Sequence, residues 1–264
     1  MNQDQVKDKL LQLGKPTKEF TLIFSGKKSK KVDGLYKSDE RQIILHNKNF
    51  ANDNELIYTA IHEFAHHIQF TESSLPISSR AHTTAFWSLF HSLLKEAEEM
   101  GLYVSIFEQK QEFVVLTRQI KEEFLQVNGN LMKDFGELLL KARGLCEKYG
   151  TSFEDYLDRI LCIPRSSAKT IMRSHQFNLN PQIGFENMRT VASIPSQATR
   201  EQAQEDLING DSPDMVRMRY ITAPKQLDEL QVLKTEKTRI EKTIRTLNTR
   251  LEELNRRISD HAGT

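Results

Sequence analysis

The residues best suited to chemistry stand close together, in the segment His62-Glu63-Phe64-Ala65-His66. On an α-helix, residues four apart share a face, so the imidazoles of His62 and His66 can point at one divalent ion. Glu63 lies beside that ion and can take a proton from the water that the ion acidifies. The spacing therefore predicts a Zn²⁺ site with a carboxylate base at its open coordination position.

The segment around these residues is predicted to be an amphipathic helix that begins near Glu55. Its apolar residues recur at helical spacing, and they are Leu56, Ile57, Ala60, Ile61, Phe64, Ala65 and Ile68. Burying two histidines and a glutamate on such a helix is costly unless they are paired, which favours a metal site over a chance cluster on a solvated face. The pattern is the His-Glu-x-x-His motif of zinc peptidases.

Two histidines do not complete a catalytic zinc site, which usually takes three protein ligands and leaves the fourth position for water. The candidates downstream are His82, His91 and the carboxylates of a second helix, which we expect over Thr83 to Met100. His82 stands between a polar loop, Thr71 to Arg80, and that helix. A loop of this length can bring the chain back across the mouth of the site.

The segments HEFAHHIQF and AHTTAFWSLF, separated by a polar loop, resemble the SprT-like zinc metalloproteases and the related minigluzincins over about residues 20 to 104. In that group, an HExxH helix is followed by a segment of the form H-x-x-x-F, whose histidine is the third ligand. The resemblance implies that His62, His66 and His82 bind Zn²⁺ and that Glu63 is the general base.

The same resemblance implies that Phe86 and Trp87 pack the second helix against the first, and that a protein is the substrate. This chain lacks the Cys-rich zinc ribbon of the larger family members. His67, about 100° round the helix from His66, is expected at the surface or behind the ligands. His91 is expected to be structural.

An oxyanion-stabilising group is also expected in a peptidase. Tyr36, Tyr103 and His91 are the candidates, and their spacing does not rank them.

The predicted fold class is α+β. Short β-branched or aromatic runs at Phe20 to Phe24, Gly34 to Tyr36 and Gln42 to His46 indicate three strands, which we expect to form an antiparallel meander. Together with the two helices they would form a zincin-like domain over residues 1–104. A helical region over residues 105–223 and a coiled-coil tail over residues 224–264 are expected to follow.

The helical region is expected to run from about Phe107 to Gln176, with breaks near Asn128-Gly129 and Tyr149-Gly150, and then to continue in short helices between prolines. Residues 153–177 have the layout of a helix-turn-helix and resemble the DNA-binding region of ParB/KorB-like proteins. The candidate contacts to double-stranded DNA are Arg165, Ser167, Lys169, Thr170 and Arg173. Plain structural helices are the alternative, with Ala168, Ile171 and Met172 inward in either case.

The tail has a heptad pattern. Position a holds Leu230, Lys237, Ile244, Leu251 and Ile258, and position d holds Leu233, Ile240, Leu247 and Leu254. This pattern predicts a homodimer through a two-stranded coiled coil, with an amphipathic helix packed on its own domain as the alternative.

The composition excludes some classes of protein and indicates the cellular compartment. Among 264 residues, 37 Lys+Arg balance 36 Asp+Glu, which excludes a globally polybasic protein. No apolar run is long enough to span a bilayer, and the N-terminal segment MNQDQVKDKL lacks the features of a secretory signal. Cys146 and Cys162 form neither a disulfide framework nor a CxxC site, so we expect reduced thiols and a cytoplasmic protein.

Three functions fit these patterns. The first is a zinc peptidase that cleaves a protein substrate and associates with DNA. The second is a peptidase of the ImmA/IrrE type, which joins an HExxH domain to helix-turn-helix elements and cleaves a repressor, but lacks the H-x-x-x-F-W segment as the source of the third ligand. The third is a DNA-binding or scaffolding protein with a silent zincin domain, against which the intact Glu63 argues.

Overall fold

The structure, a computed structural model, describes residues 1–14, 18–72, 82–222 and 229–262. Most of the loop expected between the two site helices therefore lies outside the described residues. The described elements belong to two units, of which the second contains only the last helix, and each unit is treated by itself. Most of the described elements are helices, and the described residues also form one three-stranded sheet, which confirms the expected α+β composition.

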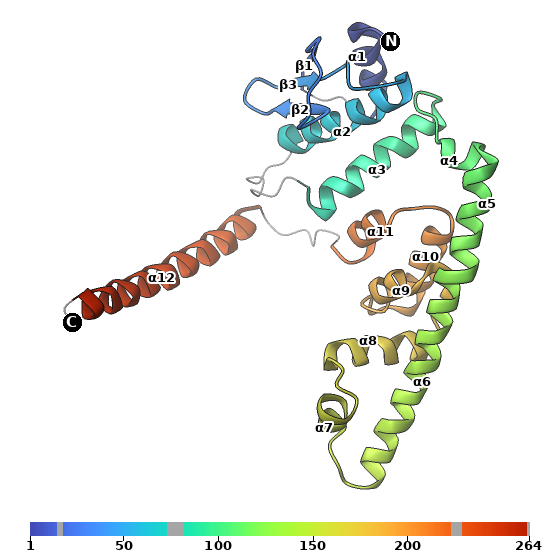
Figure 1. Ribbon diagram of the computed structural model, residues 1–264, viewed down its shortest axis with the longest axis vertical. Coiled ribbons are helices and arrows are strands. Elements are labelled where there is room, and N and C mark those ends of the chain that lie inside the picture. Colours follow the sequence, from blue (N-terminus) through green and yellow to red (C-terminus); the bar gives the residue numbers. More distant parts are fainter. Residues whose placement is uncertain (15–17, 73–81, 223–228, 263–264) are drawn as a thin grey trace. The chain divides into compact units, whose positions relative to one another are not determined.

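The N-terminal part contains a helix, three strands and two longer helices (Figure 1). These are α1 (Gln3–Leu11), β1 (Thr21–Phe24), β2 (Gly34–Lys37), β3 (Gln42–Leu45), α2 (Asp53–Glu72) and α3 (Thr84–Glu99). The strands match the predicted runs, and α3 matches the predicted second helix.

The strand order corrects the expected antiparallel meander. The order is β1-β3-β2, so β3 lies in the centre, antiparallel to β2 but parallel to β1. The chain leaves β1, passes to the far edge of the sheet and returns through the β2–β3 hairpin. Asn49 holds this crossover, because its side chain accepts from the Ser29 backbone N–H and donates to the Ser29 carbonyl and to Asp33. Alternating burial within a strand gives its inner face but not its neighbours, so the meander was a wrong inference from a correct pattern.

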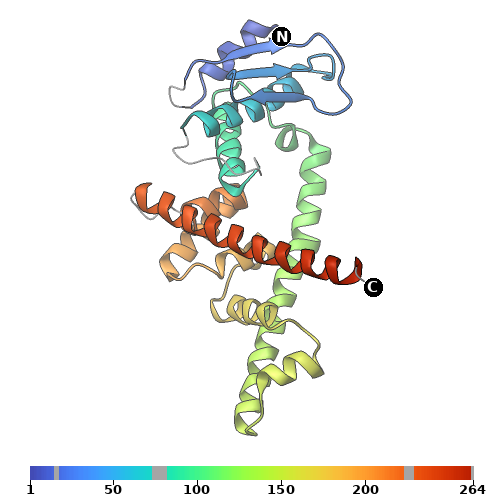
Figure 2. The ribbon, with the colours of Figure 1, turned by 90° about the vertical axis from the view of Figure 1, so that its left-hand side faces the viewer.

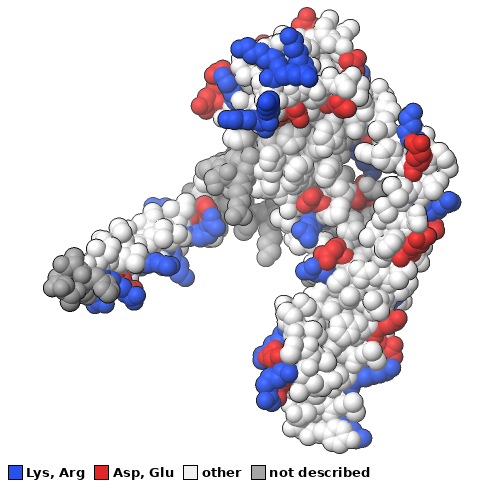
Figure 3. Space-filling model, in the orientation of Figure 1, with Lys and Arg blue, Asp and Glu red and all other residues white. Residues whose placement is uncertain are grey.

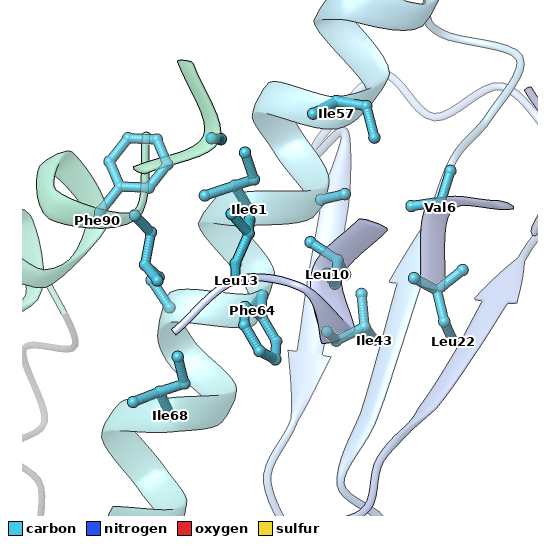
Figure 4. Packing of buried hydrophobic residues seen from close by; sticks show 14 of the residues in the cluster. Val6, Leu10, Leu13, Leu22, Ile43, Ile57, Ile61, Phe64, Ile68 and Phe90 are labelled. Atoms are coloured by element: carbon cyan, nitrogen blue, oxygen red, sulfur yellow. The ribbon is translucent and has the colours of Figure 1, made fainter. Parts of the chain in front are cut away.

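The sheet, α1 and α3 enclose α2 in one hydrophobic core (Figure 4). Ile43 and Leu45 alternate with half-buried residues on β3 and face α2. The side chain of Phe64 is fully buried, and so is that of Phe90 on α3. Burial of such a side chain stabilises the fold by about 1.5–3 kcal/mol, so this core makes α2 a rigid support for the polar groups it carries.

The next segment is helical from Ile106 to Lys148. It comprises α4 (Ile106–Gln109), α5 (Gln111–Ile120), a π-helical turn η1 (Lys121–Leu125) and α6 (Gln126–Lys148), the last three forming one continuous rod in both views (Figures 1 and 2). The predicted break near Asn128-Gly129 is wrong. A Cβ at Gly129 would lie 2.7 Å from the carbonyl oxygen of Pro181, so the glycine permits close packing inside a helix. The break at Tyr149 is confirmed, since α6 ends at Lys148.

Short elements follow the rod in sequence, and several of them pack against it. They are α7 (Phe153–Asp155), a π-helical turn η2 (Tyr156–Ile160), α8 (Arg165–Gln176), η3 (Pro181–Ile183), α9 (Phe185–Val191), α10 (Gln197–Ile208) and α11 (Pro213–Tyr220). Ala168, Ile171 and Met172 of α8 are buried, as predicted. A Cβ at Gly136 of α6 would lie 2.6 Å from the Ile171 carbonyl oxygen, so α8 lies directly on the rod.

Helix α3 is tied to α11 by a polar cluster. The carboxylate of Asp211, which is 9% exposed, binds Lys95 at 2.8 Å and Arg219 at 3.0 Å. Although burial alone raises the pKa of Asp211, hydrogen bonds from Lys95 and Arg219 hold it below its usual value. His91 Nδ1 lies 2.8 Å from Ser212 Oγ, which agrees with the structural role expected for His91.

The second unit is α12 (Glu229–Ala262), a single uninterrupted helix (Figure 2). It covers the predicted heptads, and it exposes their apolar side chains from Leu233 to Ile258. Among the described residues, no helix combines the length and apolar character that crossing a membrane requires.

Candidate metal centre

Two elements bring the three predicted ligands together. Helix α2 carries His62 and His66 one turn apart on one face. His82 stands directly before Thr83, the N-cap of α3, whose side chain accepts a hydrogen bond from the Phe86 backbone N–H. The cap fixes where α3 begins, and it thereby fixes the backbone that presents His82.

The three imidazoles converge through their Nε2 atoms. His82 Nε2 lies 3.1 Å from His62 Nε2 and 3.1 Å from His66 Nε2. A ring nitrogen carries one proton or one lone pair, so His82 Nε2 can form a hydrogen bond with only one of these neighbours. Three lone pairs directed at one ion satisfy all three nitrogens. Nitrogens at 2.0–2.1 Å from a tetrahedral Zn²⁺ lie about 3.3 Å apart, close to the spacing found.

Aromatic rings hold the imidazoles in place. The ring of Phe86 stacks on His66 at 4.2 Å between centroids, and Trp87 stacks on His82 at 5.4 Å. Phe86 also meets the rings of His62 and His82 edge-on. The resemblance implied that Phe86 and Trp87 pack the two helices together, and the structure adds that their rings contact the imidazoles of the three histidines.

The surroundings of His62 and His66 favour their uncharged form, which is the form that binds a cation. Burial, followed by the charges of the neighbouring histidines, lowers the pKa of His62 to about 4. Burial and the charge of His82 lower the pKa of His66 to about 4, against a hydrogen bond from Gln69. Both rings are therefore neutral at neutral pH, which is the form that binds metal.

Glu63 lies beside these ligands, with only 6% of its surface exposed. Burial raises its pKa to about 7, and a hydrogen bond from the backbone of Tyr36 opposes the rise. A carboxylate with a pKa near neutrality is suited to accept and return a proton.

These groups line a cleft of about 500 Å³ between α2 and the edge strand β2. Its wall consists of Val32, Asp33, Gly34, Leu35, Tyr36, Tyr58, Thr59, His62, Glu63, His66, Phe70 and His82. The cleft thus combines the candidate metal ligands, the buried carboxylate and an edge strand of the sheet.

Gly34 sets how closely β2 approaches Glu63. A Cβ at Gly34 would lie 2.8 Å from both Cγ and Oε1 of Glu63 and 3.0 Å from Thr59 Cγ2. The two contacts with Glu63 are closer than real Cβ atoms come to other atoms, so any side chain at position 34 must displace the carboxylate.

We expect Gly34→Ala to leave zinc stoichiometry unchanged and to lower the rate of peptide cleavage about 10- to 100-fold, because a displaced base is poorly aligned. Cleavage kinetics and metal analysis on the same preparation measure the two effects. Gly144→Ala is the matched control, since its added methyl group enters open space. Full activity in the Gly34→Ala protein would show that the position of Glu63 is not set by β2.

The predicted oxyanion candidates have different surroundings. Tyr36 lines the cleft, but its hydroxyl lies 3.0 Å from His67 Nδ1. Tyr103 and His91 are not part of the cleft wall. Tyr58 lines the cleft and was missed, although its place one helical turn before His62 puts it on the ligand face of α2.

The sequence left two places for His67, at the surface or behind the ligands, and the structure excludes the surface. His67 is fully buried and packs against Phe20, Phe64 and Tyr36. Its Nε2 lies 2.8 Å from the Lys18 carbonyl oxygen. His67 thus connects α2 to the strands behind the cleft and is no part of the three-histidine group.

The candidate DNA contacts all lie on α8. Arg165, Ser167 and Lys169 are exposed, whereas Thr170 and Arg173 are half-buried. Arg165 is paired with Asp158 at 2.5 Å, which neutralises its charge locally. A shallow pocket of about 180 Å³ collects hydroxyl groups and one guanidinium, from Ser166, Ser167, Thr170 and Arg189.

Basic side chains also gather beside the cleft, over the loops of the sheet (Figure 3). Lys27, Lys28, Lys30 and Lys31 are exposed on the loop that leads into Val32 and Gly34 of the cleft wall. Such a cluster raises the local concentration of anionic groups.

The site as a whole consists of three histidines close enough to hold a metal ion, next to a buried carboxylate and an open cleft. The donor set, three imidazoles, fits a catalytic zinc site better than a structural one, because structural sites usually include cysteines. Comparison of the chain with models of protein families, with curated proteins and with solved structures gives no match.

Proposed function

We propose that this chain is a zinc-dependent metallopeptidase of the SprT-like or minigluzincin kind, which cleaves a protein substrate. The observation that supports it best is the convergence of His62, His66 and His82 beside the buried carboxylate of Glu63. A purely structural metal site needs no base, and burying a carboxyl group without a role is costly.

In this proposal the three histidines hold Zn²⁺, which when bound polarises the scissile carbonyl and acidifies water. Glu63 takes a proton from the attacking water and delivers it to the leaving amine. Burial raises the pKa of Glu63 in the metal-free chain, and a carboxyl group that is more basic than usual is suited to accept a proton from water.

The cleft favours an extended peptide as the substrate. Strand β2 forms one edge of the sheet, and its residues Gly34 to Tyr36 line the cleft opposite His62 and Glu63. A peptide can add to such an edge through main-chain hydrogen bonds, which places its carbonyl groups along the row of catalytic side chains.

Association with double-stranded DNA is a second part of the proposal. The pocket on α8 and α9 offers hydroxyl and guanidinium groups of the kind that contact phosphates. The two alternatives are a repressor-cleaving peptidase of the ImmA/IrrE type and a DNA-binding protein whose zincin domain is silent.

The test is cleavage of a denatured protein by purified chain, with and without duplex DNA. We expect one zinc per chain, loss of cleavage after removal of the metal by a chelator, and recovery when Zn²⁺ but not Mg²⁺ is returned. Zinc-loaded protein that binds DNA with a steep salt dependence yet cleaves nothing would support the silent scaffold instead.

A further inference from the structure

The tail helix exposes a continuous apolar stripe. Seven side chains form it, all between 39% and 65% exposed: Leu233, Ile240, Ile244, Leu247, Leu251, Leu254 and Ile258. They repeat at alternating spacings of three and four residues, which is the seam of a coiled coil. The one polar residue on the seam is Lys237.

A second copy of α12 can cover this apolar stripe, and the charges beside the stripe indicate how the two copies would pair. Within residues 233–259, the charges beside the seam are Lys234, Glu236, Glu241, Arg250 and Arg257. Charged groups at these flanking positions set the orientation of a coiled coil, because they meet across the interface.

A parallel pair is disfavoured at two places. Equivalent seam positions face each other in a parallel dimer, so Lys237 would meet Lys237 of the second copy. The flanking charges meet with an offset of five residues, so Glu236 would meet Glu241 of the second copy. Like charges meet in both cases, and within α12 the only opposite charges that this offset pairs are those of Glu229 and Lys234 at its start.

An antiparallel pair resolves both conflicts. When Ile244 lies opposite Leu247 of the second copy, Ile240 lies opposite Leu251 and Leu233 lies opposite Ile258. Lys237 then faces Leu254, over which its aliphatic chain can lie with the ammonium group in water.

The same register places opposite charges together. Glu236 meets Arg257 of the second copy, and the symmetry of the pair repeats the contact at the other end. In the single chain, Glu236 binds Arg239 at 2.7 Å and Arg257 binds Glu253 at 2.5 Å. The side chains of Glu236 and Arg257 remain 47% and 67% exposed, so they can also reach across the seam. Sliding the register by one heptad would instead set Glu241 against itself.

We propose that α12 binds α12 of a second copy in an antiparallel coiled coil centred between Ile244 and Leu247. This proposal does not depend on the peptidase activity. The two tails then form a symmetric dimer interface, in which the start of each α12 lies beside the end of the other.

Cysteine cross-linking in the full chain tests the orientation. The background is Cys146→Ala/Cys162→Ser, which removes the native thiols and is itself the control. Adding Leu233→Cys and Ile258→Cys together is expected to give a covalent dimer on mild oxidation, with peptide mapping showing bonds between positions 233 and 258. Leu233→Cys alone is expected to give none, because the two sites would lie about 37 Å apart along the coil.

Charge reversal is the second test, and it is independent of thiol chemistry. Glu236→Arg should weaken the dimer about fivefold or more in sedimentation, since it sets Arg against Arg257 at both ends. Glu236→Arg/Arg257→Glu should restore the dimer. A parallel coil would respond in the opposite way, because Glu236→Arg would then meet Glu241 and tighten the dimer.

The proposal is overturned by a monomeric wild-type chain at tens of micromolar, by a cross-linked dimer of the single Leu233→Cys variant, or by a dimer that Glu236→Arg strengthens. The substitutions in α12 lie on exposed positions, and the two cysteine replacements in the first unit are also present in the control of the cross-linking experiment.

Discussion

Replacing Glu63 by Gln is expected to leave zinc binding intact and to reduce peptide cleavage by about 10²–10⁴-fold. The amide has the shape of the carboxyl group but cannot take a proton from water. The three histidine nitrogens converge without help from Glu63, so the metal should remain at one per chain. Single-turnover cleavage of a denatured protein, with metal analysis of the same sample, measures both quantities.

Glu72→Gln is the matched control, because it makes the same change at an exposed position of α2. It should cleave at the wild-type rate. Full cleavage by the Glu63→Gln protein would end the assignment of Glu63 as the base. Loss of zinc from that protein would mean that the carboxylate supports the metal site, and the loss of activity would then say nothing about proton transfer.

The cluster of His62, His66 and His82 could be predicted from the sequence because most of its signals are local. The spacing of His62 and His66 is a property of one helix, and helical periodicity in the same segment places them on one face. The sequence offered His82 and His91 as candidates for the third ligand, and the resemblance selected His82. The structure brings His82 Nε2 to 3.1 Å from the Nε2 atoms of His62 and His66. The hydrogen bond that caps α3 explains why a residue 16 positions after His66 can be held there.

The strand order could not be predicted, because it depends on contacts between segments that are distant in sequence. Alternation identified the inner residues Ile43 and Leu45, and burial confirms them. The same alternation fits every order of the three strands, since each order leaves the same face toward α2. The crossover is held by Asn49, and its hydrogen bonds to Ser29 and Asp33 cannot be inferred from the alternation of apolar and polar residues.

Gly129 was misjudged, and the place of His67 was left open, for a related reason. Gly129 suggests a helix break by composition, but it serves close packing against Pro181. His67 was expected at the surface or behind the ligands because only the ligand face of α2 was considered. The sheet covers the opposite face as well, and it buries His67 against Tyr36. At position 67 the helix is therefore covered and not solvated.

Replacing His82 by Ala is expected to weaken zinc binding by more than about 100-fold and to abolish cleavage. Removing a group behind a metal ligand typically costs 10- to 100-fold in affinity, and loss of a ligand itself should cost more. Only His62 and His66 would remain, and two nitrogens do not make a catalytic zinc site. Competition against a chromophoric chelator measures the affinity.

His91→Ala is the control that gives this experiment its meaning, because His91 was the other histidine candidate for the third ligand. Its ring is engaged with Ser212, so its removal should disturb the α3–α11 contact and leave zinc affinity unchanged. If the His82→Ala protein bound zinc as tightly as wild type, the third ligand would have to come from elsewhere. The H-x-x-x-F-W segment would then lose its role, and a repressor-cleaving peptidase of the ImmA/IrrE type would become the better account of the HExxH helix. The three-nitrogen geometry argues for the opposite result, since His82 is the one residue that contacts both other ligands through the same atom.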